Sequence, residues 1–295
     1  DPPAADCQTP TSGYGAAMQT RTLSALRWLA APLLALPLWT GTAQASDSAR
    51  CADPDAAPSE AVRACDRLLA SGRLSVREQA RALVNQGAAW IALGSYSQAI
   101  TAFNSAERRD PRIHLIYTNR GYAHARLNQL DDALADYGRA LAMQPGDPLA
   151  LMERGALLLR MGRAEEALAD FDALLRRAPQ DADVRFNRAL ALTALGRTED
   201  AVRALTRLTA AAPGDAAVWM ELGRARMASD PAAAVKDLTE AIRLAPEWAE
   251  AHMLRGQIYD GLGQTARADR DFLRAYELGY QSGWLTERVA GIRNR

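Results

Sequence analysis

The chain has 295 residues, and its 35 Lys and Arg are balanced by 35 Asp and Glu, so its formal net charge is zero. Nucleic-acid binding needs a clustered excess of basic side chains, which this balance does not offer. Hydrophobic residues make up 48% of the chain, which excludes a largely disordered protein, and alanine accounts for about a fifth. An alanine-rich, aromatic-poor composition favours closely packed helices over strands.

The beginning of the chain is predicted to be removed before the protein folds. Residues 1–17 are interpreted as upstream, non-native sequence, and residues 18–45 have the three parts of a signal peptide. These parts are a basic start, an apolar stretch over 28–39, and a small-x-small cleavage site at 43–45. A transmembrane anchor is the alternative, but this apolar stretch is shorter than the roughly 20 residues that a bilayer requires. We therefore expect a periplasmic protein that is not inserted in the membrane after cleavage.

Two cysteines lie downstream of this leader, Cys51 and Cys65. In an oxidising compartment they are predicted to form a disulfide, which would contribute about 3 kcal/mol of stability. Two buried free thiols are the alternative. Cys65 lies on the apolar stripe of a helix expected from Pro58 to Leu69, and residues 46–79 as a whole are expected to form an N-terminal cap.

A period of 34 residues dominates the rest of the chain. Equivalent positions in successive periods, which we call columns, hold the same residue types. A proline column contains 111, 145, 179, 213 and 246. A small-residue column contains Gly87, Gly121, Gly155, Ala189, Gly223 and Gly256. A bulky column contains Phe103, Tyr137, Phe171, Leu205, Leu238 and Phe272.

These columns predict a tandem array of helical hairpins. Small residues let two successive helices approach closely, and the bulky residues form a buried stripe. Gly94, Asn128, Gly162, Gly196 and Gly263 lie where a left-handed cap would end the first helix of each unit. A proline ends each second helix, because the residue before proline avoids helical angles. Such hairpins have a face that is buried only by stacking, so the array is predicted to form a solenoid.

The columns resemble the W-x2-L-G-x2-Y…A-x3-F-x2-A…P pattern of the tetratricopeptide repeat family. This resemblance implies an all-α, right-handed superhelical solenoid of about six helix-turn-helix repeats over residues 80–280. Capping helices are expected at both ends, the C-terminal one within 281–295. Repeat four departs from the pattern at Ala189 and Leu205, and Tyr280 replaces the last proline. The whole chain is similar to exported bacterial repeat proteins.

An arginine column precedes the small residues and holds Arg120, Arg154, Arg188 and Arg255. An acid lies sixteen residues after three of these arginines, at Asp136, Asp170 and Asp271. This pairing favours ion pairs between the two helices of a repeat. An anion-binding row of arginines is the alternative. Arg188 and Leu222 break the rule, because Arg188 faces Ala204 and Leu222 faces Asp237.

An asparagine column lies one residue further toward the N-terminus, at Asn85, Asn119 and Asn187, with Glu153 and Glu221 at the equivalent positions of two other repeats. An asparagine amide offers both a donor and an acceptor to an extended peptide backbone. The family resemblance implies that these three asparagines line a concave peptide-binding groove. Helix packing or simple solvation of the amides is the alternative.

Neighbouring positions on the same helices are also expected to face this groove. An exposed apolar surface with methionines would mark a partner site, and core packing is the alternative. The groove residues predicted in this way are Thr118, Tyr122, Met152, Phe186, Met220 and Arg224.

No catalytic motif, metal-binding spacing or phosphate-binding loop occurs in the sequence. The prediction is therefore a non-enzymatic protein that needs no cofactor or metal and binds a protein or peptide partner through an extended segment. Nucleic acid is not expected as a partner. A self-associating structural scaffold, and hence a homo-oligomer, is the alternative.

Overall fold

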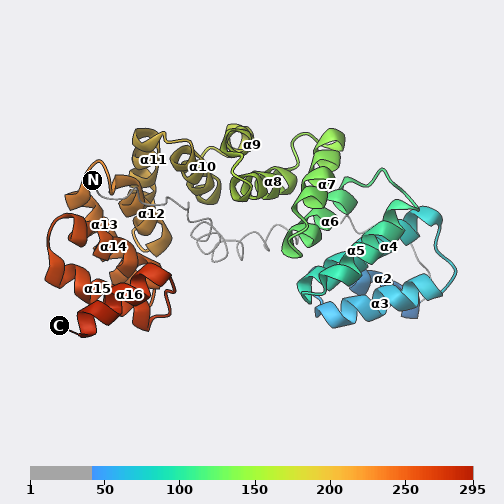
Figure 1. Ribbon diagram of the computed structural model, residues 1–295. Coiled ribbons are helices and arrows are strands. Elements are labelled where there is room, and N and C mark those ends of the chain that lie inside the picture. Colours follow the sequence, from blue (N-terminus) through green and yellow to red (C-terminus); the bar gives the residue numbers. More distant parts are fainter. Residues whose placement is uncertain (1–41, 295) are drawn as a thin grey trace. The chain divides into compact units, whose positions relative to one another are not determined.

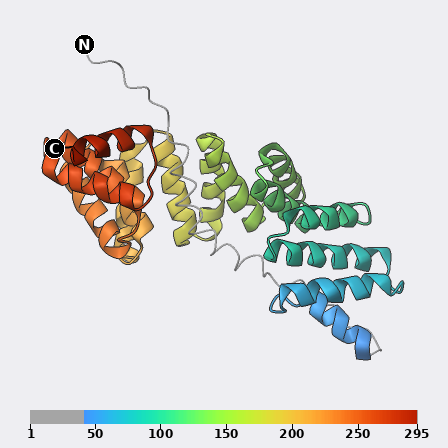
Figure 2. The ribbon, with the colours of Figure 1, turned by 60° about the horizontal axis from the view of Figure 1, so that its bottom comes forward.

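The computed structural model describes residues 42–294, which are helical with short connecting turns (Figures 1 and 2). Residues 1–17, which are predicted to be upstream sequence, and residues 18–41 of the predicted signal peptide lie outside the described residues. Fifteen helices occur in the described range, so the prediction of an all-α fold is confirmed. Their bounds are α2 Thr42–Ala52, α3 Pro58–Ala70, α4 Val76–Ala92, α5 Tyr96–Glu107, α6 His114–Arg126, α7 Leu130–Met143, α8 Pro148–Arg160, α9 Ala164–Arg177, α10 Ala182–Ala194, α11 Thr198–Ala211, α12 Ala216–Arg226, α13 Pro231–Leu244, α14 Ala249–Gly261, α15 Thr265–Glu277 and α16 Gly283–Arg293.

The helices follow the predicted period as first and second helices of six repeats. The first helices are α4, α6, α8, α10, α12 and α14, and each is followed by its second helix. The described residues fall into an N-terminal unit, 42–161, and a C-terminal unit, 162–294. In the N-terminal unit α4 packs on α5 and α6 packs on α7. In the C-terminal unit the equivalent pairs are α10 with α11, α12 with α13, and α14 with α15.

Within each unit, first helices also contact one another. Helix α4 contacts α6, and α6 contacts α8, in the N-terminal unit, while α10 contacts α12 in the C-terminal unit. Within a unit, neighbouring first helices therefore lie side by side, so residues of successive repeats come together there.

Small residues allow the close approach of first and second helices that the columns predict. A β-carbon built on Gly87 would lie 2.5 Å from the ring of Phe103, and one on Gly256 would lie 2.8 Å from the ring of Phe272. Both rings are completely buried. Any side chain at these glycines would overlap the ring, which explains why the two columns hold a small and a bulky residue.

The turns between first and second helices have the predicted left-handed caps. The residues concerned have φ angles between 60° and 73° and are Gly94, Asn128, Gly162, Gly196 and Gly263. Repeat five lacks such a residue. There Asp230 accepts a hydrogen bond from the backbone of Ala233 at 3.0 Å and begins α13 directly.

The N-terminal cap contains one helix more than predicted. Helix α3 agrees with the expected helix, and α2 packs on both α3 and α4. The predicted cleavage site at 43–45 lies within the first turn of α2. Cys51 on α2 and Cys65 on α3 form the predicted disulfide, with an S–S distance of 2.13 Å, and both residues are buried.

The C-terminal cap is the predicted single helix. Helix α16 packs on α15, and its Leu285 and Val289 are buried in a cluster with Phe272 and Ala275. The last repeat is thus covered on one side by α16.

Candidate partner-binding face of the first helices

In the N-terminal unit, three equivalent positions of the asparagine column carry side chains without hydrogen-bond partners. They are Asn85 on α4, Asn119 on α6 and Glu153 on α8, and no partner is found for them within residues 42–294. The Oδ1 of Asn85 is buried and unpaired, and Asn119 is 7% exposed. Polar groups that are shielded from water normally have partners, so the lack of partners at these three positions needs an explanation.

The column differs in the C-terminal unit. The Nδ2 of Asn187 donates to the backbone oxygen of Asp183 at 2.9 Å, and Glu221 accepts from Nε of Arg224 at 3.2 Å. These two side chains are therefore held by their own helices. The asparagine ladder expected from the sequence is unpaired at Asn85 and Asn119 only.

Three of the predicted groove residues lie in the core. The side chains of Thr118, Phe186 and Met220 are 1%, 1% and 0% exposed, so the surface expected from them is absent. Thr118 donates to the carboxylate of Asp147 at 2.9 Å, which turns it toward the start of α8. Met220 packs with Leu254. First helices contact both second helices and other first helices, so a larger part of their circumference is buried than the sequence indicated.

Of the other predicted residues, Met152 and Arg224 are partly exposed, whereas Tyr122 is buried, with an exposure of 8%. Arg224 lies between two acids: its Nε is 3.2 Å from Glu221 and its Nη2 is 2.7 Å from Glu250 on α14. Burial raises the pKa of the Glu221 carboxyl above its ordinary value, although Arg224 opposes this effect. Arg224 thus compensates two carboxylates of neighbouring repeats.

The predicted ion pairs of the arginine column are present at Arg120 and at Arg255. Arg120 makes two hydrogen bonds to Asp136, of 2.8 and 2.9 Å, and Arg255 makes two to Asp271, of 2.7 and 2.8 Å. All four groups have little solvent contact, which distinguishes these pairs from surface salt bridges.

The two exceptions to the arginine rule find other partners. Asp237 accepts from Arg226, one helical turn beyond the expected position, at 2.8 Å. Arg188 bonds Asp172, instead of residue 204, at 2.6 Å. An acid on a second helix, Asp237 on α13 or Asp172 on α9, thus pairs with an arginine on a first helix even where the column is broken.

An aromatic–arginine cluster lies on the N-terminal unit and consists of Tyr96, Tyr122 and Arg126. The rings of Tyr96 and Tyr122 meet edge to face with centroids 6.5 Å apart. The guanidinium carbon of Arg126 is 5.4 Å from the first centroid and 6.0 Å from the second. Sequence reasoning found Tyr122 but missed Tyr96, which belongs to a second helix, and Arg126, which lies outside the columns.

The carboxyl of Glu153 on α8 interacts electrostatically with Tyr122 and Arg126 of this cluster. Burial raises the pKa of its carboxyl to about 7, and the positive charge of Arg126 only partly opposes that rise. The hydroxyl of Tyr137 on α7 is buried and has no partner within the described residues. Its pKa is raised well above the ordinary value, mainly by burial and then by the charge of Glu153.

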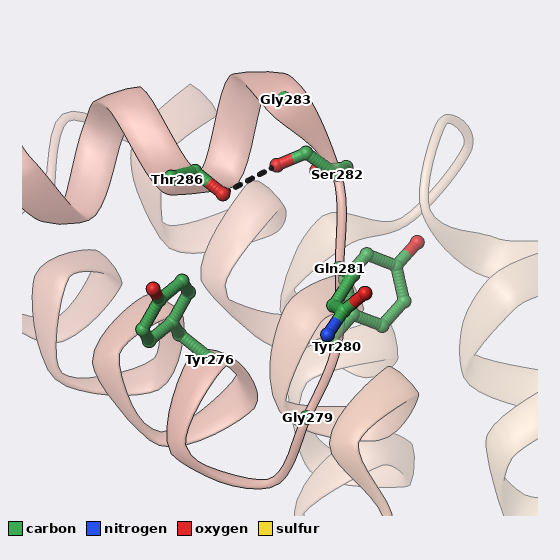
Figure 3. Close-up of a pocket in the computed structure, with 7 residues that line it drawn as sticks. All are labelled: Tyr276, Gly279, Tyr280, Gln281, Ser282, Gly283 and Thr286. Atoms are coloured by element: carbon green, nitrogen blue, oxygen red, sulfur yellow. Dashed lines mark hydrogen bonds between the residues drawn. The ribbon is translucent and has the colours of Figure 1, made fainter.

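A separate recess lies where α15 turns into α16 (Figure 3). Its volume is about 550 Å³, and Tyr276 and Tyr280 stand on opposite sides of the view. Thr286 donates to the backbone oxygen of Ser282 at 3.0 Å along its rim. No Asp, Glu, Lys, Arg or His lines this recess, so it offers shape and neutral polar groups only.

Within residues 42–294, no group of three or more His, Cys, Asp or Glu residues is arranged to hold a metal ion. No helix in that range combines the length and the apolar character needed to cross a bilayer.

Comparison with known families identifies the repeats. Profiles described as tetratricopeptide repeat match residues 58–112, 120–191, 183–225 and 224–282. Together they leave only 113–119 unmatched between residues 58 and 282. The chain belongs to the tetratricopeptide repeat family, whose members are generally non-enzymatic binding modules. No curated protein sequence matches the chain significantly.

Solved structures with the same fold are remote in sequence. A tetratricopeptide repeat protein from Parabacteroides merdae is 22% identical, with a TM-score of 0.64 over 84% of this chain and 97% of that one. PilW, described as a widely conserved type IV pilus biogenesis factor, is 21% identical, with a TM-score of 0.63 over 71% and 98%. YrrB, described as having an unusual peptide-binding site, is 19% identical, with a TM-score of 0.50 over 65% and 99%. At this identity the likeness establishes the fold alone.

Proposed function

We propose that the protein is a non-enzymatic interaction module of the cell envelope that binds an extended segment of a partner protein along the first helices of its N-terminal unit. Asn85, Asn119 and Glu153 would pair with the backbone of that segment. Tyr122 and the exposed part of Met152 would contact its side chains.

The observation that carries this proposal is the run of unpaired polar groups at equivalent positions of α4, α6 and α8. Leaving a shielded amide or carboxyl without a partner costs about 1–3 kcal/mol, so an arrangement repeated three times calls for a function. An extended chain presents alternating N–H and C=O groups. An amide side chain can accept a hydrogen bond from the N–H and donate one to the C=O. The peptide-binding site named for YrrB supports a ligand of this class.

An envelope location is supported by three features. The sequence predicts a signal peptide at 18–45, Cys51 and Cys65 are joined by a disulfide, and PilW shares the fold. Disulfides persist in oxidising compartments such as the periplasm.

Photocrosslinking in cells that express the chain tests the proposal. p-Benzoylphenylalanine replaces Ala92, which is exposed on α4 one repeat before Arg126, and in a matched control it replaces Ala135, which is exposed on the second helix α7. We expect a second protein to be joined at residue 92, through one short segment, and not at residue 135.

Other results of the same experiment would contradict the proposal. Equal capture of many proteins from both positions would show that the first helices have no special role. Capture of a second copy of this chain alone would favour the self-associating scaffold.

A further inference from the structure

The aromatic–arginine cluster of the N-terminal unit carries an inference that rests on the proposed function and specifies the partner. We propose that Tyr96, Tyr122 and Arg126 form a subsite for a carboxylate side chain, Asp or Glu, of the extended segment that binds the first helices.

The first step is the geometry of Arg126. Its guanidinium carbon lies 5.4 Å from the ring centroid of Tyr96 and 6.0 Å from that of Tyr122. Contacts with two ring faces restrict a long side chain that would otherwise lose its freedom only on binding. Arg126 is therefore held in place before a ligand arrives, which lowers the entropic cost of recognition.

The second step is whether the charge of the Arg126 guanidinium is already paired with a carboxylate. Arg126 is exposed, and among residues 42–294 it has no carboxylate within 4.0 Å. Arg120, on the same helix, is instead buried against Asp136 and Glu107. A guanidinium has five donors arranged to match the two oxygens of a carboxylate. Arg126 therefore offers a charge that is not engaged in an ion pair, whereas the charge of Arg120 is fully engaged.

The third step is position relative to the unpaired amides. Asn119, Tyr122 and Arg126 are spaced at i, i+3 and i+7 on α6, so they lie along one face. The seven residues from Asn119 to Arg126 correspond to about 10 Å of helix. An extended segment advances about 3.3 Å per residue, so a segment paired with Asn119 brings a side chain to Arg126 within a few residues.

The fourth step is the charge of the surroundings. Three groups interact electrostatically with the Tyr122 hydroxyl, and they are Arg126, Glu153 on α8 and Tyr96. Glu153 lies more than 4.0 Å from Arg126, since the two form no ion pair. Burial keeps a substantial fraction of its carboxyl protonated at neutral pH, so it repels an incoming acid less than an ordinary glutamate would. A basic partner residue, by contrast, would compete with Arg126 for both rings.

The test is a selection of random 12-residue peptides displayed on phage against the wild-type chain, followed by affinity measurements on the selected peptides. We expect the selected peptides to share an acidic residue at one fixed position. For such a peptide, Arg126→Gln is expected to weaken binding about tenfold, as does replacement of the acidic residue by its amide. The two changes together should cost no more than either alone.

Arg139→Gln is the matched control. Arg139 lies on α7, is exposed, and contacts the ring of Tyr117 at 5.9 Å, so it repeats the arginine–tyrosine contact on a second helix. Its replacement should leave the affinity unchanged.

The outcomes separate this proposal from the proposed function. Peptides that lose affinity on Asn119→Ala, but share no acidic residue and bind Arg126→Gln normally, overturn the carboxylate subsite and leave the groove intact. Peptides that share a basic residue overturn it as well. Failure to select any peptide, or selected peptides indifferent to both substitutions, overturns both proposals.

Discussion

Gly121 lies directly against the ring of Tyr137, and a β-carbon on Gly121 would stand 2.9 Å from the Cδ1 atom of that ring. The backbone oxygen of Ala133 would be 3.2 Å from the same carbon. Contact between α6 and α7 therefore depends on the absence of a side chain at residue 121. The same relationship recurs at Gly87 and Gly256, which makes it the local reason for the repeat pattern.

Substitution of Gly121 tests this packing. Gly121→Ala is expected to lower the free energy of unfolding by about 1–3 kcal/mol, because the added methyl forces the two helices apart. Gly138→Ala is the control: Gly138 lies inside α7 with no atom within 4 Å of the added carbon. Its substitution should stabilise the chain by roughly 0.5–1 kcal/mol, through helix propensity alone. Urea denaturation followed by circular dichroism measures both, and equal effects would contradict the packing argument.

The hydroxyl of Tyr137 is not expected to contribute favourably to the free energy of unfolding. It is buried and unpaired, whereas the equivalent residues Phe103, Phe171 and Phe272 have no hydroxyl. Tyr137→Phe should therefore leave the free energy of unfolding unchanged or raise it by up to about 1 kcal/mol. A loss of more than about 1 kcal/mol would show that the hydroxyl is bonded in solution.

Glu153 predicts a specific pH dependence of stability. Its folded pKa of about 7 lies above the ordinary value of 4.5, so the folded state binds more protons than the unfolded state between these pH values. The carboxyl therefore lowers stability progressively as the pH rises from 4.5 to 7, and its full effect is present above pH 7.

Glu153→Gln should remove this effect. The substituted chain is expected to match the wild type near pH 4 and to be more stable above pH 7 by about 1–2 kcal/mol, since partial exposure offsets some of the penalty. Denaturation curves at pH 4, 6 and 8 measure the difference. A difference that does not change with pH would contradict the raised pKa.

The buried ion pair between Arg120 and Asp136 predicts a large loss on removal of one partner. Arg120→Met should cost about 3–5 kcal/mol, because Asp136 would remain buried without its cation. Arg243→Gln is a suitable control: it breaks an exposed pair with Glu240 and should cost less than about 1 kcal/mol. Thermal denaturation of both variants tests the contrast, and similar melting temperatures would refute it.

The disulfide between Cys51 and Cys65 is expected to stabilise the N-terminal cap. The pair encloses a sequence separation of 14 residues, and replacing both cysteines by alanine should cost about 2–4 kcal/mol. Maleimide labelling of the purified chain under denaturing conditions checks the bond itself. We expect both residues to react only after reduction, and labelling without reductant would show free thiols.

The fold was largely predictable because the columns record contacts within a repeat. The turn residue Asn128 and the pairs Gly87–Phe103 and Arg120–Asp136 involve neighbours along the chain or in one hairpin, so each leaves a fixed spacing. Helix α2 was missed because its sequence is polar, has little apolar periodicity and overlaps the predicted cleavage site.

The candidate face was less predictable for a different reason. The exposure of Phe186 and Met220 depends on contacts between repeats, which a column cannot record. Tyr96 and Arg126 come from different helices, so no spacing links them. The sequence identified Asn85 and Asn119, but only the structure distinguishes them from Asn187, whose amide is already bonded.

The central claim is that Asn85 and Asn119 hold the backbone of a partner segment, and its most direct test is the affinity of a synthetic peptide that covers the crosslinked segment. Isothermal titration would compare the wild-type chain with the double variant Asn85→Ala, Asn119→Ala, after circular dichroism has shown unchanged helicity. We expect the double variant to bind about 10–100-fold more weakly, since about 1 kcal/mol or more is lost at each amide. Equal affinity for both chains would contradict the account and leave the two asparagines as packing residues.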